Sequence, residues 1–402
     1  MAIKNASVRD SNVSVVKSLL AFNLFVFLFF KQVDKLTIPL SFVWFFFLFF
    51  MTKNEKNIKA MNALFFVCLY SIAIAFVYFF GGTQSLIVLF NDVTVYLIIY
   101  CSIASSMYLS RKNQGDYIIK LIILIGLINS LANIYSWVTI TGGAVGRYNF
   151  ASIINGSVSG NIEISVIAAL LILSFSFNKK TEKWVLFAIC SSNVLIILTR
   201  RIQVIYIIYI IFYVFCINHK EKRLSKTVNR LLVLIIIAIL LFVTFQSVFE
   251  TIFSQFYNLF DSNRADQIQR TLATRDAIEM FNSSHWLGVG YGNYALNTKY
   301  TDLASPHGGF FSILSEQGII GMVFTLLFLF NLVKLSMWSA FEYNSNTVIA
   351  AAIITGVSAL MFFTSNFTFL PPPNERAYYL GCCIGWLLIG YLIHNRDESL
   401  GK

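Results

Sequence analysis

A histidine and a glutamate lie nine positions apart in the stretch SPHGGFFSILSEQGIIG, at the start of a long apolar run. Histidine has an ordinary pKa of about 6.5, so His307 can exchange a proton near neutral pH. We treat His307 as a candidate general base. Glu316 is then either the group that orients His307 or a residue that holds the preceding loop, and the spacing allows both. The alternative for His307 is a helix-capping or interfacial histidine.

A polar segment at about 250–308 precedes this pair. Its part NRADQIQRTLATRDAIEMF can form a helix with Ile268, Leu272 and Arg275 on one face. Arg275 and Glu279 have the spacing of an ordinary helical ion pair, and an amphipathic helix on the membrane surface is the plainer interpretation. The next stretch, HWLGVGYGNY, contains three alternating glycines. Because no strand precedes them, they predict a tight turn rather than a nucleotide-binding loop.

The elements that must position these residues are membrane helices. The chain of 402 residues is 57% hydrophobic and 12% charged, with 40 phenylalanines, which is too apolar for one soluble core. This composition predicts an all-α polytopic membrane protein and excludes nucleic-acid machinery. About twelve apolar runs are long enough to be transmembrane helices. They lie near 15–30, 37–51, 61–80, 86–109, 117–139, 161–177, 183–199, 202–217, 231–249, 309–333, 347–366 and 377–393.

These runs divide the chain into three parts. Residues 1–249 hold nine predicted transmembrane helices, residues 250–308 form one large extracytoplasmic loop, and residues 309–402 hold three further helices and a tail. Basic stretches such as TKNEKNIK and HKEKRLSKTVNR fall on every second loop. Because lysine and arginine in short loops stay cytoplasmic, both termini are expected inside. The net charge of +11 is then a topology and anionic-lipid signal.

The cations expected outside differ in kind from those inside. The inner loops carry about fifteen lysines and five arginines, whereas the outer face carries three lysines and seven arginines. Guanidinium binds phosphate or carboxylate through two parallel hydrogen bonds, which indicates anion binding; chance and surface ion pairs are the alternative. The outer arginines are Arg147, Arg200, Arg201, Arg264, Arg270, Arg275 and Arg376, the last of which follows a rigid turn with three prolines.

Three acids lie near the outer ends of predicted spans: Asp92, Glu163 and Glu316. Charges at membrane depth usually face a partner or a wet cavity. They suggest an outward-opening polar cleft lined by arginines, although simple interfacial placement is equally compatible with each acid.

No metal site is predicted. The four histidines are scattered along the chain, and no outer loop carries Asp-x-Asp. The six cysteines all fall within apolar runs, so they are expected to be small core residues without disulfides.

The order of these motifs resembles the O-antigen ligase and Wzy polymerase superfamily. The matching features are Arg275 opening the loop helix, the glycine turn that ends at Asn293, His307, and Glu316 with Gly318 and Gly321 beyond it. LTRRIQV resembles the family's Ser-Arg step, with Arg200 the better match and Arg201 the alternative. The chain departs from the family pattern at Gly308, where a small polar amide is common, and at His285 and Trp286, which replace a proline.

The resemblance implies a metal-independent, cofactor-free glycosyltransferase of the GT-C type in the bacterial cytoplasmic membrane, with its active site facing outward. It implies transfer of a glycan from undecaprenyl pyrophosphate, with a chain-length regulator and a flippase as partners. His307, Arg275 and Arg200 are the implied catalytic residues. The implied substrate-binding residues are Arg201, Glu316, Arg147, Arg264, Arg270, Arg376 and Asn293.

Three functions remain open. A polymerase would pass the growing chain to a new lipid-linked repeat unit, whereas a ligase would pass it to lipid A core or a protein. We favour the polymerase because no soluble domain is appended and because the richness in Ile, Phe, Asn and Lys is common where polysaccharide loci are diverse. A glycolipid flippase is less compatible, because no internal repeat or matching pair of broken spans is found.

Overall fold

The computed structural model describes residues 2–29, 34–52, 73, 86–142, 159–196, 200–220, 265–290, 292–303, 306, 309–361 and 379–399. Within these ranges the chain is helical and contains no strand. The helices are α1 (Ala2–Phe29), α2 (Asp34–Thr52), α4 (Leu86–Arg111), α5 (Gly115–Thr141), α6 (Ser159–Ser174), α7 (Lys180–Ile196), α8 (Arg200–Lys220), α11 (Ala265–Ser283), the 3-10 helix η2 (Tyr294–Leu296), α12 (Gly309–Glu342), α13 (Asn346–Met361) and α14 (Tyr379–Ser399).

The helices confirm a polytopic membrane protein. Five of them are long and apolar enough to cross a membrane, and three shorter segments are also apolar. Ten of the predicted spans coincide with helices of the structure, while the runs at 61–80 and 231–249 lie outside the described residues. The total of twelve spans and the division into three parts stay predictions.

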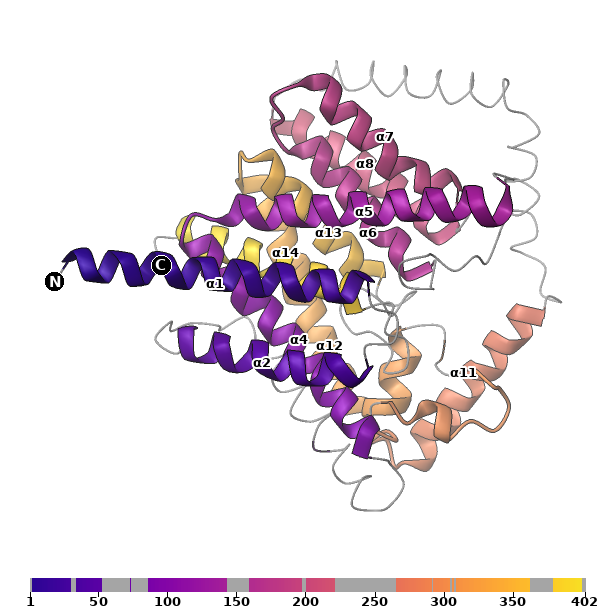
Figure 1. Ribbon diagram of the computed structural model, residues 1–402. Coiled ribbons are helices and arrows are strands. Elements are labelled where there is room, and N and C mark those ends of the chain that lie inside the picture. Colours follow the sequence, from indigo (N-terminus) through magenta and orange to yellow (C-terminus); the bar gives the residue numbers. More distant parts are fainter. Residues whose placement is uncertain are drawn as a thin grey trace, which may run out of the picture.

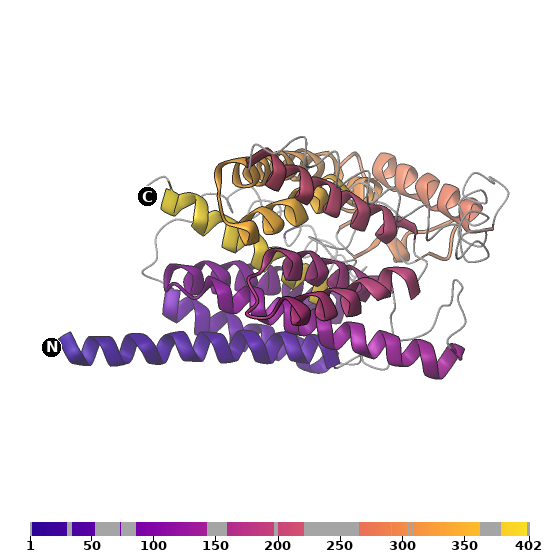
Figure 2. The same ribbon diagram turned by 90° about the horizontal axis from the view of Figure 1, so that it is seen from above.

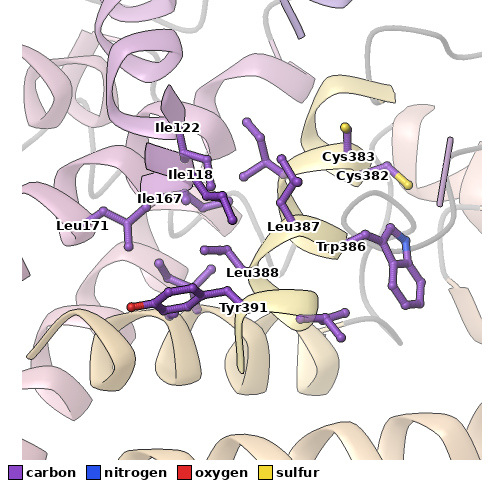
Figure 3. Close-up of a cluster of buried hydrophobic side chains, with 14 of the residues drawn as sticks. Ile118, Ile122, Ile167, Leu171, Cys382, Cys383, Trp386, Leu387, Leu388 and Tyr391 are labelled. Atoms are coloured by element: carbon purple, nitrogen blue, oxygen red, sulfur yellow. The ribbon is translucent and has the colours of Figure 1, made fainter. Parts of the chain in front are cut away.

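Helix α14 lies at the centre of the packing (Figure 3). Its residues from Tyr379 to Ile393 are almost all buried, as expected for a helix that is apolar on every side. Leu387 and Leu388 point toward isoleucines of α5 and α6, and on another side Trp386 packs against Phe328 of α12 with ring centroids 5.3 Å apart. Helix α14 is therefore packed against other helices on all sides.

Helix α4 packs closely against α14 through small residues. Ser106 Oγ donates a 2.6 Å hydrogen bond to the carbonyl oxygen of Leu387, and Ser102 Oγ lies 3.0 Å from Cys383 Sγ. A Cβ on Gly390 would lie 2.9 Å from the carbonyl oxygen of Ile103. Small side chains let two backbones approach within the membrane. The five described cysteines are all buried and free, which agrees with their predicted role as core residues, and Cys68 lies outside the described residues.

The two chain termini lie at the same end of the molecule, and α11 lies at the opposite end (Figures 1 and 2). The end with the termini also contains the turn between α4 and α5. There Lys17 Nζ donates a 2.6 Å hydrogen bond to Gln114 Oε1, and Gly115 lies against Tyr391.

Helix α8 runs toward the end with the termini, because Tyr213 near its last turns donates to the carbonyl oxygen of Leu173 at the end of α6. Helix α12 ends beside α8, with His219 and Phe341 in ring contact. The orientation expected from the basic loops, with both termini inside, stays a prediction.

Candidate active site

Helix α11 carries a buried stripe of small and apolar residues. Ala273, Ala277 and Met280 have helical spacing and pack against Val289 and Tyr294. The stripe differs from the face suggested by sequence, because Ile268 is 49% exposed and Arg275 is exposed. The predicted i, i+4 ion pair is present, with Arg275 Nε 3.4 Å from Glu279 Oε1.

The glycine-rich stretch forms the predicted tight turn. Gly288, Gly290 and Gly292 have φ angles of 85°, 91° and 80°, which glycine adopts without the steric cost that a Cβ brings. The chain leaves α11 through two further left-handed residues, His285 (φ 53°) and Trp286 (φ 69°). These two residues redirect the chain between the end of α11 and the glycine turn.

The turn docks onto a break in α12 at Gly318, which has φ 64° and ψ −160°. The N–H groups of Val289 and Gly290 donate to the carbonyl oxygens of Ser315 and Glu316 at 2.8 Å each, and the N–H of Ile319 donates to the carbonyl oxygen of Trp286 at 2.9 Å. The backbone N–H and carbonyl groups that the break leaves unpaired in one segment are thus hydrogen-bonded by the other segment.

Gly288 and Gly318 make this docking possible. A Cβ on Gly318 would lie 2.2 Å from the Trp286 carbonyl oxygen, and a Cβ on Gly288 would lie 2.5 Å from the Glu316 carbonyl oxygen. Both distances are far below van der Waals contact, and the groups they would meet are backbone. We refer to α11, residues 284–303 and α12 up to Gly318 as the loop unit.

The break explains how an acid comes to lie in an apolar helix. The 24 residues of α12 beyond Gly318 extend about 36 Å, which is enough to cross a hydrocarbon core of about 30 Å. Glu316 belongs to the preceding nine residues, 309–317, which pack against the turn. It is 4% exposed and accepts hydrogen bonds from the backbone N–H groups of Tyr294, at 3.4 Å, and Gly292.

Two roles were considered for Glu316. Its hydrogen bonds from Tyr294 and Gly292 support the role of holding the loop. His307 lies outside the described residues, so its orientation by Glu316 stays a prediction.

A second buried carboxylate, Asp276 on α11, holds residues 299–301, which follow the residues held by Glu316. It is 1% exposed and accepts hydrogen bonds from the N–H groups of Lys299, Tyr300 and Thr301 at 2.9 to 3.3 Å. Sequence reasoning missed it, although a signal was present: Asp276 lies within the stripe that contains Ala273, Ala277 and Met280. The two carboxylates together fix residues 292–301, which lead toward His307.

Tyr294 lies between the two carboxylates. Its hydroxyl donates a 2.9 Å hydrogen bond to the carbonyl oxygen of Ala273. Burial, and then the charges of Asp276 and Glu316, raise the pKa of Tyr294, so the phenol stays a protonated donor. The Tyr294 side chain therefore connects η2 to α11 through this hydrogen bond throughout the ordinary pH range.

A charged cluster lies on the exposed side of α11. The Arg275 guanidinium carbon lies 4.1 Å from the centroid of the Tyr300 ring, a cation–π distance. Glu279 approaches both Arg275 and Lys299, whose Nζ is 3.5 Å from Glu279 Oε2. A hydrogen bond from Tyr300, aided by Lys299 and Arg275, lowers the pKa of Glu279. Arg275 is thus held by two neighbours while its side chain remains 61% exposed.

The other predicted site residues are only partly placed. Arg200 and Arg201 belong to the first turn of α8, but their side chains lie outside the described parts, as do Arg147, Arg264 and Arg376. Arg270 is exposed on α11. Asn293 is buried and donates from Nδ2 to the Val289 carbonyl oxygen at 3.0 Å, so its amide closes the turn.

A small pocket lies where the first turns of α6 and α8 meet the last turn of α13. Glu163, Ile202 and Met361 line it, together with a hydrogen-bonded pair formed by Tyr209 and Ser358 at 2.9 Å. The pocket brings Glu163 toward the turn of α8 that carries Arg200 and Arg201. The side chain of Asp92 lies outside the described parts, so the wider cleft stays a prediction.

No group of three or more His, Cys, Asp or Glu side chains that could hold a metal ion occurs in the described portion of the chain. The prediction of a metal-independent site is not tested by this, because His307 lies outside that portion.

Comparison with known families finds a match to part of the chain. Residues 185–326 match a family model described as O-antigen ligase, a segment that covers about a third of the chain. The match begins in α7, includes Arg200 and the whole loop unit, and ends in α12. No curated protein matches the chain.

Proposed function

We propose, from the confirmed likeness of residues 185–326 to the O-antigen ligase and Wzy polymerase superfamily, that this membrane protein is a polysaccharide repeat-unit polymerase. It transfers a glycan chain from undecaprenyl pyrophosphate onto a new lipid-linked repeat unit. The broader function, that of an enzyme of O-antigen ligase or polymerase type that acts on lipid-linked polysaccharide, rests on the family match itself.

One structural observation carries the proposal. The loop unit presents Arg275 with its guanidinium stacked on Tyr300 and exposed, while two buried carboxylates fix the segment that leads to His307. A transferase of an activated sugar needs groups held in fixed positions and a stabilised leaving group. The rigid loop unit is suited to this task.

The proposed step needs a base and two anion-binding arginines. The acceptor hydroxyl attacks the anomeric carbon, its proton passes to His307, and the bond from that carbon to the pyrophosphate oxygen breaks. The departing lipid pyrophosphate carries away the electron pair of that bond. Arg275 and Arg200 stabilise the negative charge that develops on it, with Arg201, Arg147, Arg264, Arg270 and Arg376 as candidate substrate contacts.

The proposed location is the cytoplasmic membrane of a bacterium, with both termini inside and the loop unit outside. The arrangement of the termini and α11 at opposite ends of the molecule supports this orientation. The fold beyond the helical bundle is proposed to resemble the GT-C type, and a flippase and a chain-length regulator are proposed partners.

The test is the banding pattern of surface glycan in a strain that lacks the gene, complemented with wild type or with His307→Ala. A polymerase predicts single repeat units on the final acceptor for both the deletion and His307→Ala. If full-length chains instead stay on undecaprenyl pyrophosphate, the protein is a ligase and the polymerase proposal is wrong.

Arg200→Ala and Arg275→Ala, made in the same strain, are expected to give the single-unit pattern with normal amounts of protein in the membrane. Normal polymer from His307→Ala would refute the proposed chemistry while leaving the location untouched.

A further inference from the structure

The turn that follows α11 exposes two large apolar side chains. Trp286 is 59% exposed and Leu287 is 51% exposed. Trp286 stacks on Phe281, with ring centroids 6.4 Å apart and planes inclined by 13°. The indole is therefore held in one orientation, on a backbone that is itself fixed by the bond from Ile319.

These side chains continue an apolar strip on α12. The N–H of Ile319 bonds to the carbonyl oxygen of Trp286, which places the turn beside the first residues after the break. From there Ile319, Ile320 and Val323 are 48%, 37% and 50% exposed, and the exposed apolar series goes on through Leu326, Leu327 and Phe330. An exposed apolar series of this kind marks an interaction with protein or membrane, and α12 is long and apolar enough to cross a membrane.

The length of α12 sets the depth of the turn. The 24 residues beyond Gly318 extend about 36 Å, slightly more than a hydrocarbon core of about 30 Å. Gly318 therefore lies near one boundary of the core, and Trp286 lies at the same level. Tryptophan is enriched at this level because its ring is apolar while its N–H prefers a polar environment.

We propose that Trp286 and Leu287 form a membrane anchor that inserts into the outer-leaflet interface and seats the loop unit on the lipid surface. The occupant of this apolar surface is lipid, at the depth of the glycerol groups and the first methylenes of the acyl chains. The anchor sets the height of the loop unit above the membrane. This inference does not depend on the proposed enzyme activity.

Site-directed spin labelling of full-length protein in lipid vesicles tests the anchor. Nitroxide labels are placed at Leu287→Cys, at Val323→Cys as the lipid-facing reference, and at Leu296→Cys as the matched control. Leu296 is also apolar and 63% exposed, but it lies in η2 beside polar residues. Wild type treated with the same reagent corrects for native cysteines.

The label at 287 is expected to collide with oxygen several-fold more than with a water-soluble nickel chelate, as at 323, whereas the label at 296 shows the reverse. If the label at 287 behaves like the one at 296, the turn lies in water and the proposal is wrong. If it is shielded from both reagents, protein covers the surface, which also overturns the lipid anchor.

A second measurement avoids cysteine variants. The difference in emission between wild type and Trp286→Phe isolates one of the six tryptophans. This difference signal is expected to be quenched by lipids brominated near the head-group end of the acyl chain and to be little affected by aqueous iodide. Preferential quenching by iodide would contradict the anchor.

Discussion

The contact between α4 and α14 and the contact between the turn and α12 both bring backbone close to backbone, but by different means. In the first, two regular helices keep their own hydrogen bonds and approach through Ser106 and Gly390. In the second, α12 is broken at Gly318 and the turn supplies the missing partners.

The difference shows where the molecule depends on single residues. A regular helix satisfies its backbone internally, so no backbone group in the α4–α14 contact depends on a side chain for its hydrogen bond. In the loop unit, Asp276 accepts hydrogen bonds from three backbone N–H groups and Glu316 from two, in a segment that has no regular element to pair with. Substitutions there are expected to loosen a whole segment.

The largest effect is expected for Gly318→Ala. The φ of 64° and ψ of −160° at Gly318 fall in a region used almost solely by glycine, where another residue costs about 1–3 kcal/mol, and the Cβ of alanine would also meet the Trp286 carbonyl oxygen at 2.2 Å. We expect polymer formation to fall by at least about tenfold, which corresponds to about 1.4 kcal/mol. Gly381→Ala is the control, because a Cβ there meets nothing within 4 Å. Unchanged polymer from Gly318→Ala would show that the docking of the turn is dispensable.

Asp276→Asn should have the next largest effect. Hydrogen bonds to a charged acceptor contribute about 1.5–3 kcal/mol each, and this carboxylate accepts from three residues. Amide hydrogen exchange at Lys299, Tyr300 and Thr301 is expected to become at least about tenfold faster. The exposed Asp302→Asn serves as the matched control. Equal protection in the two variants would mean that Asp276 does not hold this segment.

Gly390→Ala tests the contact between α4 and α14. Its Cβ would lie 2.8 Å from Ser106 Cβ, an overpacking that typically costs about 1–3 kcal/mol. Thermal unfolding in detergent should occur at a lower temperature than in Gly381→Ala, whereas exchange at residues 299–301 should not change. Faster exchange in that segment would show that the two regions are coupled.

The smallest effect is expected for Glu279→Gln, because exposed ion pairs contribute little and are screened by salt. The pKa of Glu279 lies below its ordinary value of 4.5, chiefly through the hydrogen bond from Tyr300. Its stabilising interactions are therefore present above the ordinary value and are lost only as pH falls through the lowered one. Arg275 should stay paired between about pH 5 and 8. The measurement is activity as a function of pH. If activity changes between about pH 5 and 8 in wild type and this change is lost in Glu279→Gln, the assignment is wrong.

Much of the fold was predictable because membrane helices are defined by local composition. Runs such as 86–109 and 117–139 required only enough apolar residues to cross a bilayer, and α4 and α5 occupy them. The helix at 265–283 followed from its periodicity, and the turn followed from three glycines that tolerate positive φ.

The candidate site was predictable only as a set of residue types. Arg275, Glu316 and the glycine turn could be recognised from their order along the chain, and all of them lie within residues 185–326, which match the family model described as O-antigen ligase. The roles assigned to Arg200, Arg275 and His307 stay predictions. The part played by Asp276 was missed because an acid that directly follows an arginine in a polar helix looks like an ordinary solvent-exposed residue.

The sequence by itself determined which segments are helices, that most of them are apolar enough for a membrane, and that a polar loop with a tight turn precedes α12. Only the tertiary structure decided that α12 breaks at Gly318, that the turn fills this break, and that two buried carboxylates hold residues 292–301. The physical reason is that local patterns report hydrophobicity and backbone preference, whereas the partner of a non-helical N–H or carbonyl group is set by which segments meet in space.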